Sequence, residues 1–346
     1  MRHSFQTQPN LQITPIEKIR LPLQSRDELP PILAGLQWLW MHPTLKAEIF
    51  ALLEVKILAG KKATGRTGMD LWQILVLGVV RLGLDADWDR MADLANHHLL
   101  IRQMLGLPAV PWGDETKSFG HQTLRDNVAL LDDELLGQIN ARIAAAGREV
   151  FAKKGGAPLA ALEVKVDTYV LETDVHFPTD LNLLWDAGRK CVDLIATDQH
   201  QLIQDYDVPA SQADVDQSVP VADRLLGRYG VGQIASLSFD KGFTRAQDRD
   251  LLSLYVPEVV MPKRGKKTAA ETERESGKKF VALRRAHSAV ESDINSLEHH
   301  GLNRCLDVGW QGYLRYVGYG VMSYNLHQIG RELLARARAD AVQWAA

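Results

Sequence analysis

The stretch LEVKVDTYVLET, residues 162–173, decides the fold class of this chain. Apolar and polar residues alternate along it, and β-branched residues are frequent, which is typical of a β-strand. A long region with helical spacing precedes it, and strand-like and helix-like segments alternate after it. Such an order predicts an α/β core, a mixed sheet flanked by helices, behind an all-α N-terminal domain.

The chain divides into three parts by composition and pattern. Residues 1–26 are polar and contain several prolines, so we expect an extended N-terminal arm. Residues 27–155 carry apolar side chains at helical spacing and form the expected helical domain. Within it, 71–84 reads as a buried core helix capped by Asp70, and 123–143 as one amphipathic helix. Residues 156–346 form the expected sheet domain with a C-terminal helix.

Further elements follow the first strand. Strands are predicted within TDQHQLIQDYDV (197–208), IASLSFDKGF (234–243) and EVVMPKRG (258–265), and LNLLWDAGRKCVDLIA (181–196) reads largely as helix. Helices are also predicted at 218–229, at 278–300 with an end at Gly301, and at 313–338.

Composition excludes several classes of protein. The 346 residues include 40 Lys and Arg against 43 Asp and Glu, a formal charge of −3, so any basic surface must be local. The two cysteines, Cys191 and Cys305, lie far apart, which fits neither a zinc motif nor a disulfide framework and favours a reducing cytoplasm. The start lacks the apolar core of a signal peptide, and 71–84 is too short to cross a bilayer, so no membrane association is expected.

Three acidic residues occupy informative positions. Asp167 lies in the middle of the first strand, Asp240 ends a later strand, and Glu291 lies on a helix. Together they offer the hard oxygen ligands that a pair of Mg²⁺ or Mn²⁺ ions prefers, and two such ions support phosphodiester displacement. Taken singly, each has an ordinary alternative: a paired structural aspartate, a turn at DKG, and a solvated helix glutamate.

Longer strings around these residues resemble a known family. Three blocks resemble those of DDE insertion-sequence transposases and occur in the same order. The first aspartate block corresponds to residues 166–190 and the second to 236–252. The glutamate-helix block corresponds to 259–267 followed by 283–304. LWQILVLGVVRLGLDADWDRMADLANHHLLIRQMLG, residues 71–106, is similar to their helical DNA-binding region. The chain looks most like the bacterial elements filed as "not classified yet".

The resemblance implies a function for each part. It implies an RNase H-like catalytic domain in which Asp167, Asp240 and Glu291 hold two Mg²⁺ or Mn²⁺ ions and cut and join DNA. The DNA partners would be the terminal inverted repeats of the element and its target DNA, bound by a homodimer. His287 and Glu298 stand where related proteins often have arginine and lysine, and Arg304 remains a candidate phosphate contact.

One departure from the family suggests an impaired enzyme. An RNase H-like sheet begins with three antiparallel strands, but few residues separate Asp180 from Asp198. We therefore expect one strand to be missing or improvised, as the result of an internal deletion relative to the family. The alternatives are a DNA-binding remnant without activity, a metal-dependent nuclease of the same fold, and a helical interaction protein.

Two regions are candidates for DNA binding. A basic stretch near the third acidic block suits a polyphosphate, although it also fits a solvated loop. Residues 88–105 read as two short helices around a turn, compatible with helix-turn-helix docking or with a plain helical bundle. The candidate residues are Lys263, Arg264, Lys266 and Lys267 in the basic stretch, and Arg90, Asn96, His97, His98 and Arg102 in the helices.

Overall fold

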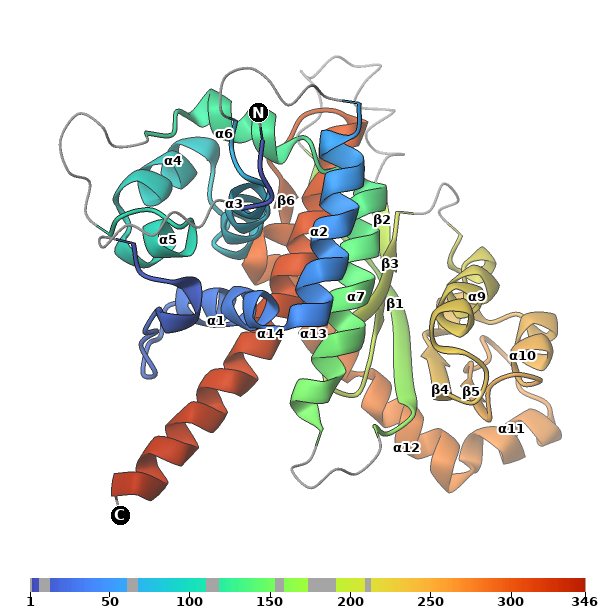
Figure 1. Ribbon diagram of the computed structural model, residues 1–346. Helices are drawn as coiled ribbons and strands as arrows, with labels where there is room; N and C mark the ends of the chain where they lie inside the picture. The colour runs from blue at the N-terminus through green and yellow to red at the C-terminus, as the bar shows by residue number, and fades with distance from the viewer. Residues whose placement is uncertain are drawn as a thin grey trace. The chain divides into compact units, whose positions relative to one another are not determined.

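The computed structural model describes residues 2–5, 13–60, 68–109, 118–152, 159–173, 191–208 and 213–345. It contains an N-terminal helical region, a five-stranded mixed sheet with helices, and a long C-terminal helix, so the predicted mixed α/β class is confirmed (Figure 1). By its contacts the chain forms two compact units. The helical unit comprises Met1–Val150 and His299–Ala346, and the sheet unit comprises Phe151–Glu298.

The helical unit is built around α3 (Leu71–Gly83), every residue of which is buried, as the apolar run predicted. The Asp70 backbone N–H at its start donates to Gln73 Oε1. None of the described helices combines the length and hydropathy that crossing a membrane requires. The other elements of this unit are η1 (Ile16–Lys18), α1 (Leu29–Met41), α2 (Pro43–Leu58), α4 (Trp88–His97), α5 (Leu99–Met104), α6 (His121–Val128), α7 (Asp133–Phe151), β6 (Arg304–Cys305) and α14 (Trp310–Ala345).

The single helix predicted at 123–143 is wrong. The chain leaves helical geometry after α6, and α7 starts at Asp133. Asp132 supports this new start, because its Oδ1 accepts a hydrogen bond of 3.1 Å from the Leu135 N–H. A side chain that accepts from the first turn competes with continuing the helix, which apolar spacing alone does not reveal.

The C-terminal helix α14 packs closely on α1. A Cβ atom added to Gly35 would lie 2.1 Å from the Leu326 carbonyl oxygen, and one added to Gly330 would lie 1.8 Å from that of Pro31. Glycine therefore permits the two backbones to touch. We expected α14 with the sheet domain, whereas its contacts group it with the N-terminal helices.

The sheet has the strand order β3-β2-β1-β4-β5. The first three strands form an antiparallel meander, and β4 and β5 continue it in parallel with β1. The strand predicted at 162–173 is confirmed. The bounds are β1 (Leu162–Thr173), β2 (Cys191–Thr197), β3 (Ile203–Asp207), β4 (Ile234–Phe239) and β5 (Glu258–Val260).

The predicted helix at 181–196 is wrong in its described part, and so is the predicted loss of a strand. Residues 191–197 form β2, which pairs with β1 over seven positions, including Ile195 opposite Asp167. The stretch LIA is fully buried in the sheet. Because a short apolar run has no distinct period, sequence cannot separate a buried strand from a helix here. Residues 181–190 lie outside the described part of the chain.

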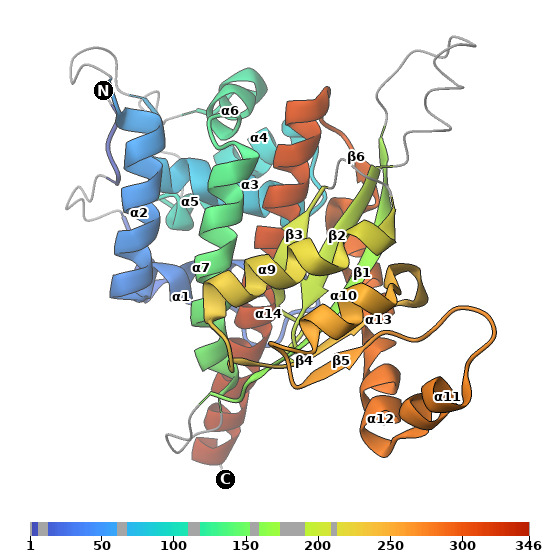
Figure 2. The same ribbon diagram turned by 90° about the vertical axis from the view of Figure 1, so that its right-hand side faces the viewer.

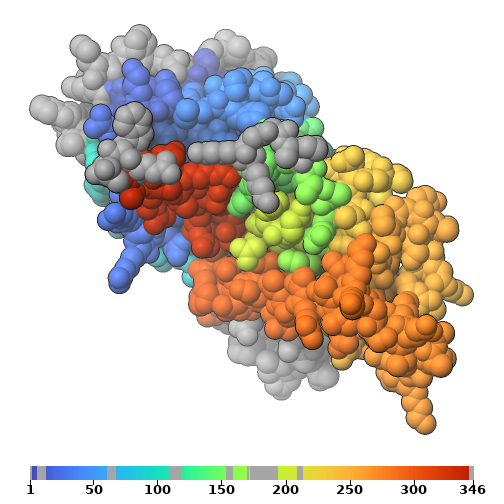
Figure 3. All heavy atoms as spheres, turned by 90° about the horizontal axis from the view of Figure 1, so that it is seen from below, coloured from blue at the N-terminus to red at the C-terminus, as the bar shows by residue number. Residues whose placement is uncertain are grey.

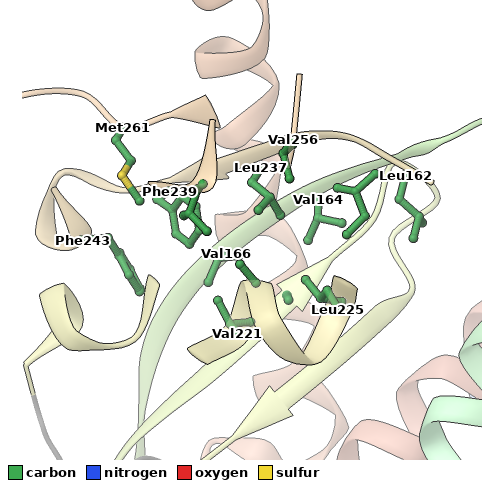
Figure 4. Packing of buried hydrophobic residues seen from close by; sticks show 14 of the residues in the cluster. Leu162, Val164, Val166, Val221, Leu225, Leu237, Phe239, Phe243, Val256 and Met261 are labelled. Carbon is green, nitrogen blue, oxygen red and sulfur yellow. The ribbon is translucent and has the colours of Figure 1, made fainter. Parts of the chain in front are cut away.

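One face of the sheet holds the core of this unit. Val164, Val166, Leu237 and Phe239 lie in one hydrophobic cluster that α9 (Ser218–Tyr229) helps to cover (Figure 4). Figure 2 shows α9 and α10 (Ala246–Leu252) lying across this face. Since side chains alternate along a strand, the residues between these positions face the opposite side.

The predicted helix at 278–300 is interrupted. It consists of α12 (Lys278–His287), α13 (Ala289–Leu297) and the π-helical turn η4 (Glu298–Leu302). Gly301 ends it with a φ of +84°, a conformation that favours glycine, so the predicted end is confirmed. The 3₁₀ turns η2 (Asp214–Asp216) and η3 (Lys241–Phe243) and the helix α11 (Ala269–Ser276) complete the sheet unit.

Candidate metal centre on the sheet

Asp167 and Asp240 lie side by side on neighbouring strands. The parallel strands β1 and β4 pair Val166 with Phe239, and each aspartate is the next residue along its strand direction. Val166 and Phe239 point into the core, so both aspartates follow on the opposite side of the sheet. Strand pairing alone therefore brings two of the three predicted carboxylates together.

The helix α13 supplies the third predicted carboxylate, Glu291. It packs against β1, with Val290 and Leu297 fully buried, while Glu291 stays exposed. The negative charges of Asp240 and Glu291 both act on Asp167 and raise its pKa. The three predicted acidic residues are thus electrostatic neighbours in the fold.

Asp167 itself is perturbed by its surroundings. Burial is the largest cause, and with the nearby carboxylates it raises the pKa of Asp167 to about 6. The Thr168 backbone N–H donates to Asp167 Oδ1 at 2.8 Å, and this hydrogen bond lowers the pKa of Asp167. Among described residues, no lysine or arginine pairs with Asp167, Asp240 or Glu291. A cation at this place would relieve the repulsion.

A fourth carboxylate, Asp214, was missed by the sequence reading. It lies in η2, and its Oδ1 accepts a hydrogen bond of 3.2 Å from Thr168 Oγ1. Its charge also raises the pKa of Asp167. A Cβ atom on Gly242 would lie 2.3 Å from Asp214 Oδ2, so this glycine makes room for it. The only signal in the sequence was the acidic pair in ADVDQS (213–218).

This set of residues fits divalent cations. Mg²⁺ and Mn²⁺ prefer carboxylate oxygens, and all four side chains offer them. The oxygens of these four side chains include no three that all lie within 4.8 Å of one another in the described structure. As placed, these carboxylates therefore do not converge on one ion position. Asp167 is the carboxylate on which the charges of the other three all act.

His287 lies at the same site. It ends α12, and its half-buried ring lies near the Ser238 backbone of β4 and the carboxylates of Asp240 and Glu291. Burial lowers the pKa of His287, although the charges of Asp240 and Glu291 partly offset this. Burial of this ring therefore favours its neutral form over the charged form that a phosphate contact would need. The nearby Glu298 is exposed.

The basic stretch is only partly free for DNA. Lys263 Nζ contacts Glu271 at 2.8 Å, and Lys267 Nζ contacts Glu275 at 2.6 Å. The bond from Lys263, with help from the Thr268 N–H, lowers the pKa of Glu271 to about 2. Both lysines therefore already have carboxylate partners on α11, and their role as DNA contacts stays a prediction.

Arg264 and Lys266 remain as candidates. Both are exposed, and neither forms an ion pair with another residue that the structure describes. In Figure 3 the segment that contains them and the following helices (orange) lies at the surface.

The candidate DNA contacts of the helical unit differ in their exposure to solvent. The two short helices predicted at 88–105 are confirmed as α4 and α5, joined through His98. Arg102 is 2% exposed and donates to the carbonyl oxygens of Pro108 and Asn96, so its prediction as a DNA contact is wrong. Arg102 is buried in the fold, and a helical pattern in the sequence cannot show whether a particular polar residue will be buried or exposed. Arg90 and Arg304 are exposed.

Comparisons with models of protein families, with curated proteins and with solved structures find no match to this chain. The geometry of the site and the sequence patterns therefore carry the functional argument.

Proposed function

We propose that this protein is a DDE-type DNA transposase with an RNase H-like catalytic domain. The observation that carries the proposal is the register of β1 and β4, which sets Asp167 beside Asp240 while α13 brings Glu291 against β1. Proteins of this kind use two carboxylates on the sheet and one on a helix.

Strand order supports the same proposal. An RNase H-like sheet begins with an antiparallel meander of three strands, and β1, β2 and β3 form such a meander. The order β3-β2-β1-β4-β5 places Asp167 on the central strand. With the meander complete, the argument for an impaired enzyme loses its main support, and we propose an active one.

Each acidic residue has a defined part in the proposed chemistry. Asp167 would hold both ions, and Asp240 and Glu291 would each complete one. When bound, Mg²⁺ or Mn²⁺ activates an attacking oxygen and stabilises the leaving oxygen of a phosphodiester. Asp167 must be ionised to bind a cation, which its pKa of about 6 permits at neutral pH. Arg264 and Lys266 would bind DNA phosphates.

The test is cleavage and joining of element-end DNA by the full chain. Labelled duplexes that carry the terminal inverted repeats of the element are incubated with target DNA and Mg²⁺ or Mn²⁺. We expect metal-dependent cleavage and strand transfer, lost in Asp167→Asn, Asp240→Asn and Glu291→Gln. Asp223→Asn is the matched control, because Asp223 is exposed on α9, which covers the other face.

Other outcomes separate the alternatives. Cleavage without joined products would indicate a nuclease of the same fold. Tight binding of element ends with no metal-dependent cleavage would indicate a DNA-binding remnant. Cleavage that survives all three substitutions would remove these residues from the active site and overturn the proposal.

A further inference from the structure

A second group of metal-ligand residues lies within the helical unit. Glu28 precedes α1, His300 lies in η4, and His327 lies in α14. One ligand atom from each of the three lies within 4.8 Å of the others. Because these residues are far apart in the sequence, only the packing of the unit brings them together.

Both histidines are deeply buried. His300 is 6% exposed and His327 is 3% exposed, and their ring centroids lie 4.5 Å apart. Neither ring nitrogen of His327 forms a well-aligned hydrogen bond among the described residues, although Nε2 lies 2.6 Å from Glu28 Oε2. Burying two imidazoles against each other is costly unless their nitrogens are used. Glu28, by contrast, reaches solvent, with 57% of its side chain exposed.

A backbone contact prepares His300 as a ligand. Its Nδ1 lies 3.1 Å from the Gly83 carbonyl oxygen, which can only accept, so Nδ1 carries the proton. The lone pair of the ring is then on Nε2. A histidine that donates one N–H to a backbone carbonyl and offers its other nitrogen is the usual arrangement at a metal.

We propose that His300, His327 and Glu28 bind one Zn²⁺ ion. Two imidazole nitrogens and one carboxylate oxygen are a ligand set that zinc accepts, with water in the fourth position on the exposed side of Glu28. The ion replaces the proton between His327 and Glu28, which is released to solvent. The bound ion ties the start of α1 to α14 and η4. This site shares no residue with the carboxylates of the sheet, and its existence does not depend on the proposed function.

Ion-pair formation without metal is the competing explanation. Glu28 would then simply neutralise a protonated His327, and the hydrogen bond from His327 indeed lowers the pKa of Glu28. That explanation gives no use to Nε2 of His300, whose Nδ1 already donates to the Gly83 carbonyl oxygen. It also predicts no affinity for Zn²⁺, so a binding measurement separates the two.

The experiment is a titration of the untagged, chelator-treated full chain with ZnCl₂ by calorimetry and with CoCl₂ by visible absorption. We expect one tight site per chain and a higher Tm with Zn²⁺. Glu28→Gln and His300→Gln should each weaken Zn²⁺ binding at least about 100-fold. Mutation of a residue that only hydrogen-bonds to a metal ligand already lowers metal affinity by about 10- to 100-fold. Glu17→Gln and His299→Gln are exposed matched controls and should bind like the wild type.

Two results would contradict the proposed zinc site. In the first, the wild-type chain binds no Zn²⁺ at micromolar concentration. In the second, Glu28→Gln binds Zn²⁺ as tightly as the control Glu17→Gln. Glu28 is exposed and makes no side-chain cap, so its substitution leaves a folded chain even where His300→Gln does not. Loss of binding in Asp167→Asn would likewise contradict a site separate from the sheet.

Discussion

Asp167 and Asp240 each directly follow one member of the register pair Val166–Phe239 on parallel strands β1 and β4. Their proximity is therefore a consequence of backbone pairing and does not depend on flexible side chains. Residues held on a sheet in this way form a rigid platform for ligands. Glu291 and Asp214 approach the same platform from other elements.

Asp167→Asn should separate stability from activity. The substitution removes a charge that is partly buried among carboxylates, so we expect the free energy of unfolding at pH 7 without metal to rise by about 1 to 2 kcal/mol, allowing for partial exposure. Cleavage should be abolished, and DNA binding should remain. Urea unfolding, cleavage assays and gel-shift titrations on the same preparation measure the three effects. A destabilised variant would contradict the electrostatic account of this residue.

The stability gain of Asp167→Asn should depend on pH. The pKa of Asp167 is about 6 in the folded chain, against about 3.9 in an unfolded one. Above pH 6 both states are ionised, and the folded state bears the full cost of the charge. As the pH falls toward 4, the folded state takes up a proton first and the cost disappears. The difference between wild type and variant, measured by urea unfolding in EDTA at pH 7, 6 and 5, should therefore shrink.

Gly242→Ala should disturb the site through Asp214. The new Cβ would lie 2.3 Å from Asp214 Oδ2, so this carboxylate must move and its bond from Thr168 is strained or lost. We expect at least about tenfold slower cleavage, because small displacements at an active site are costly. Gly227→Ala is the control, since nothing lies within 4 Å of its added Cβ on α9. Equal cleavage rates in the two variants would show that the position of Asp214 is unimportant.

Arg264 and Lys266 should account for the DNA affinity of the basic stretch. Replacing both by alanine removes two free cations, so the slope of log K against log[salt] should fall by about 2. Replacing Lys263 and Lys267 should instead loosen α11, because their partners Glu271 and Glu275 lose their counterions. Salt-dependent binding and hydrogen exchange of residues 263–276 distinguish the pairs. An unchanged slope in the first variant would exclude these residues from the DNA surface.

Arg102→Ala should act on folding. Its removal leaves the carbonyl oxygens of Pro108 and Asn96 without their donor in a buried place, which costs about 2 to 4 kcal/mol. Arg90 is exposed, and Arg90→Ala should change stability by less than about 0.5 kcal/mol. Thermal unfolding of both variants compares them directly. An Arg102→Ala chain as stable as Arg90→Ala would contradict the structural role.

Strong local signals predicted much of the fold. The strand predicted from the alternation in residues 162–173 and the helix predicted at 218–229 have the bounds of β1 and α9. The apolar run before Leu84 predicted a buried helix, and α3 is one. The prediction of secondary structure failed where one sequence pattern is compatible with two structures. The apolar stretch at 191–197 became a strand because β1 offered its free edge, and Asp132 split one amphipathic stripe into α6 and α7.

The candidate sites divide along the same line. Asp167 and Asp240 were visible because a carboxylate inside or at the end of a strand is unusual. Asp214 had no such signal, because an acid in a polar turn is ordinary until its neighbours are known. The same holds for Lys263 and Lys267, whose partners lie eight residues further on in another element.

By itself the sequence determined which segments become helix or strand and which residues carry acidic or basic chemistry, because periodicity and residue type act over a few neighbouring positions. Only the tertiary structure decided which of these groups meet. Strand register set Asp167 beside Asp240, and helix packing brought Glu28 to His300 and His327. Burial of apolar faces selects such long-range pairings, and no local pattern encodes them.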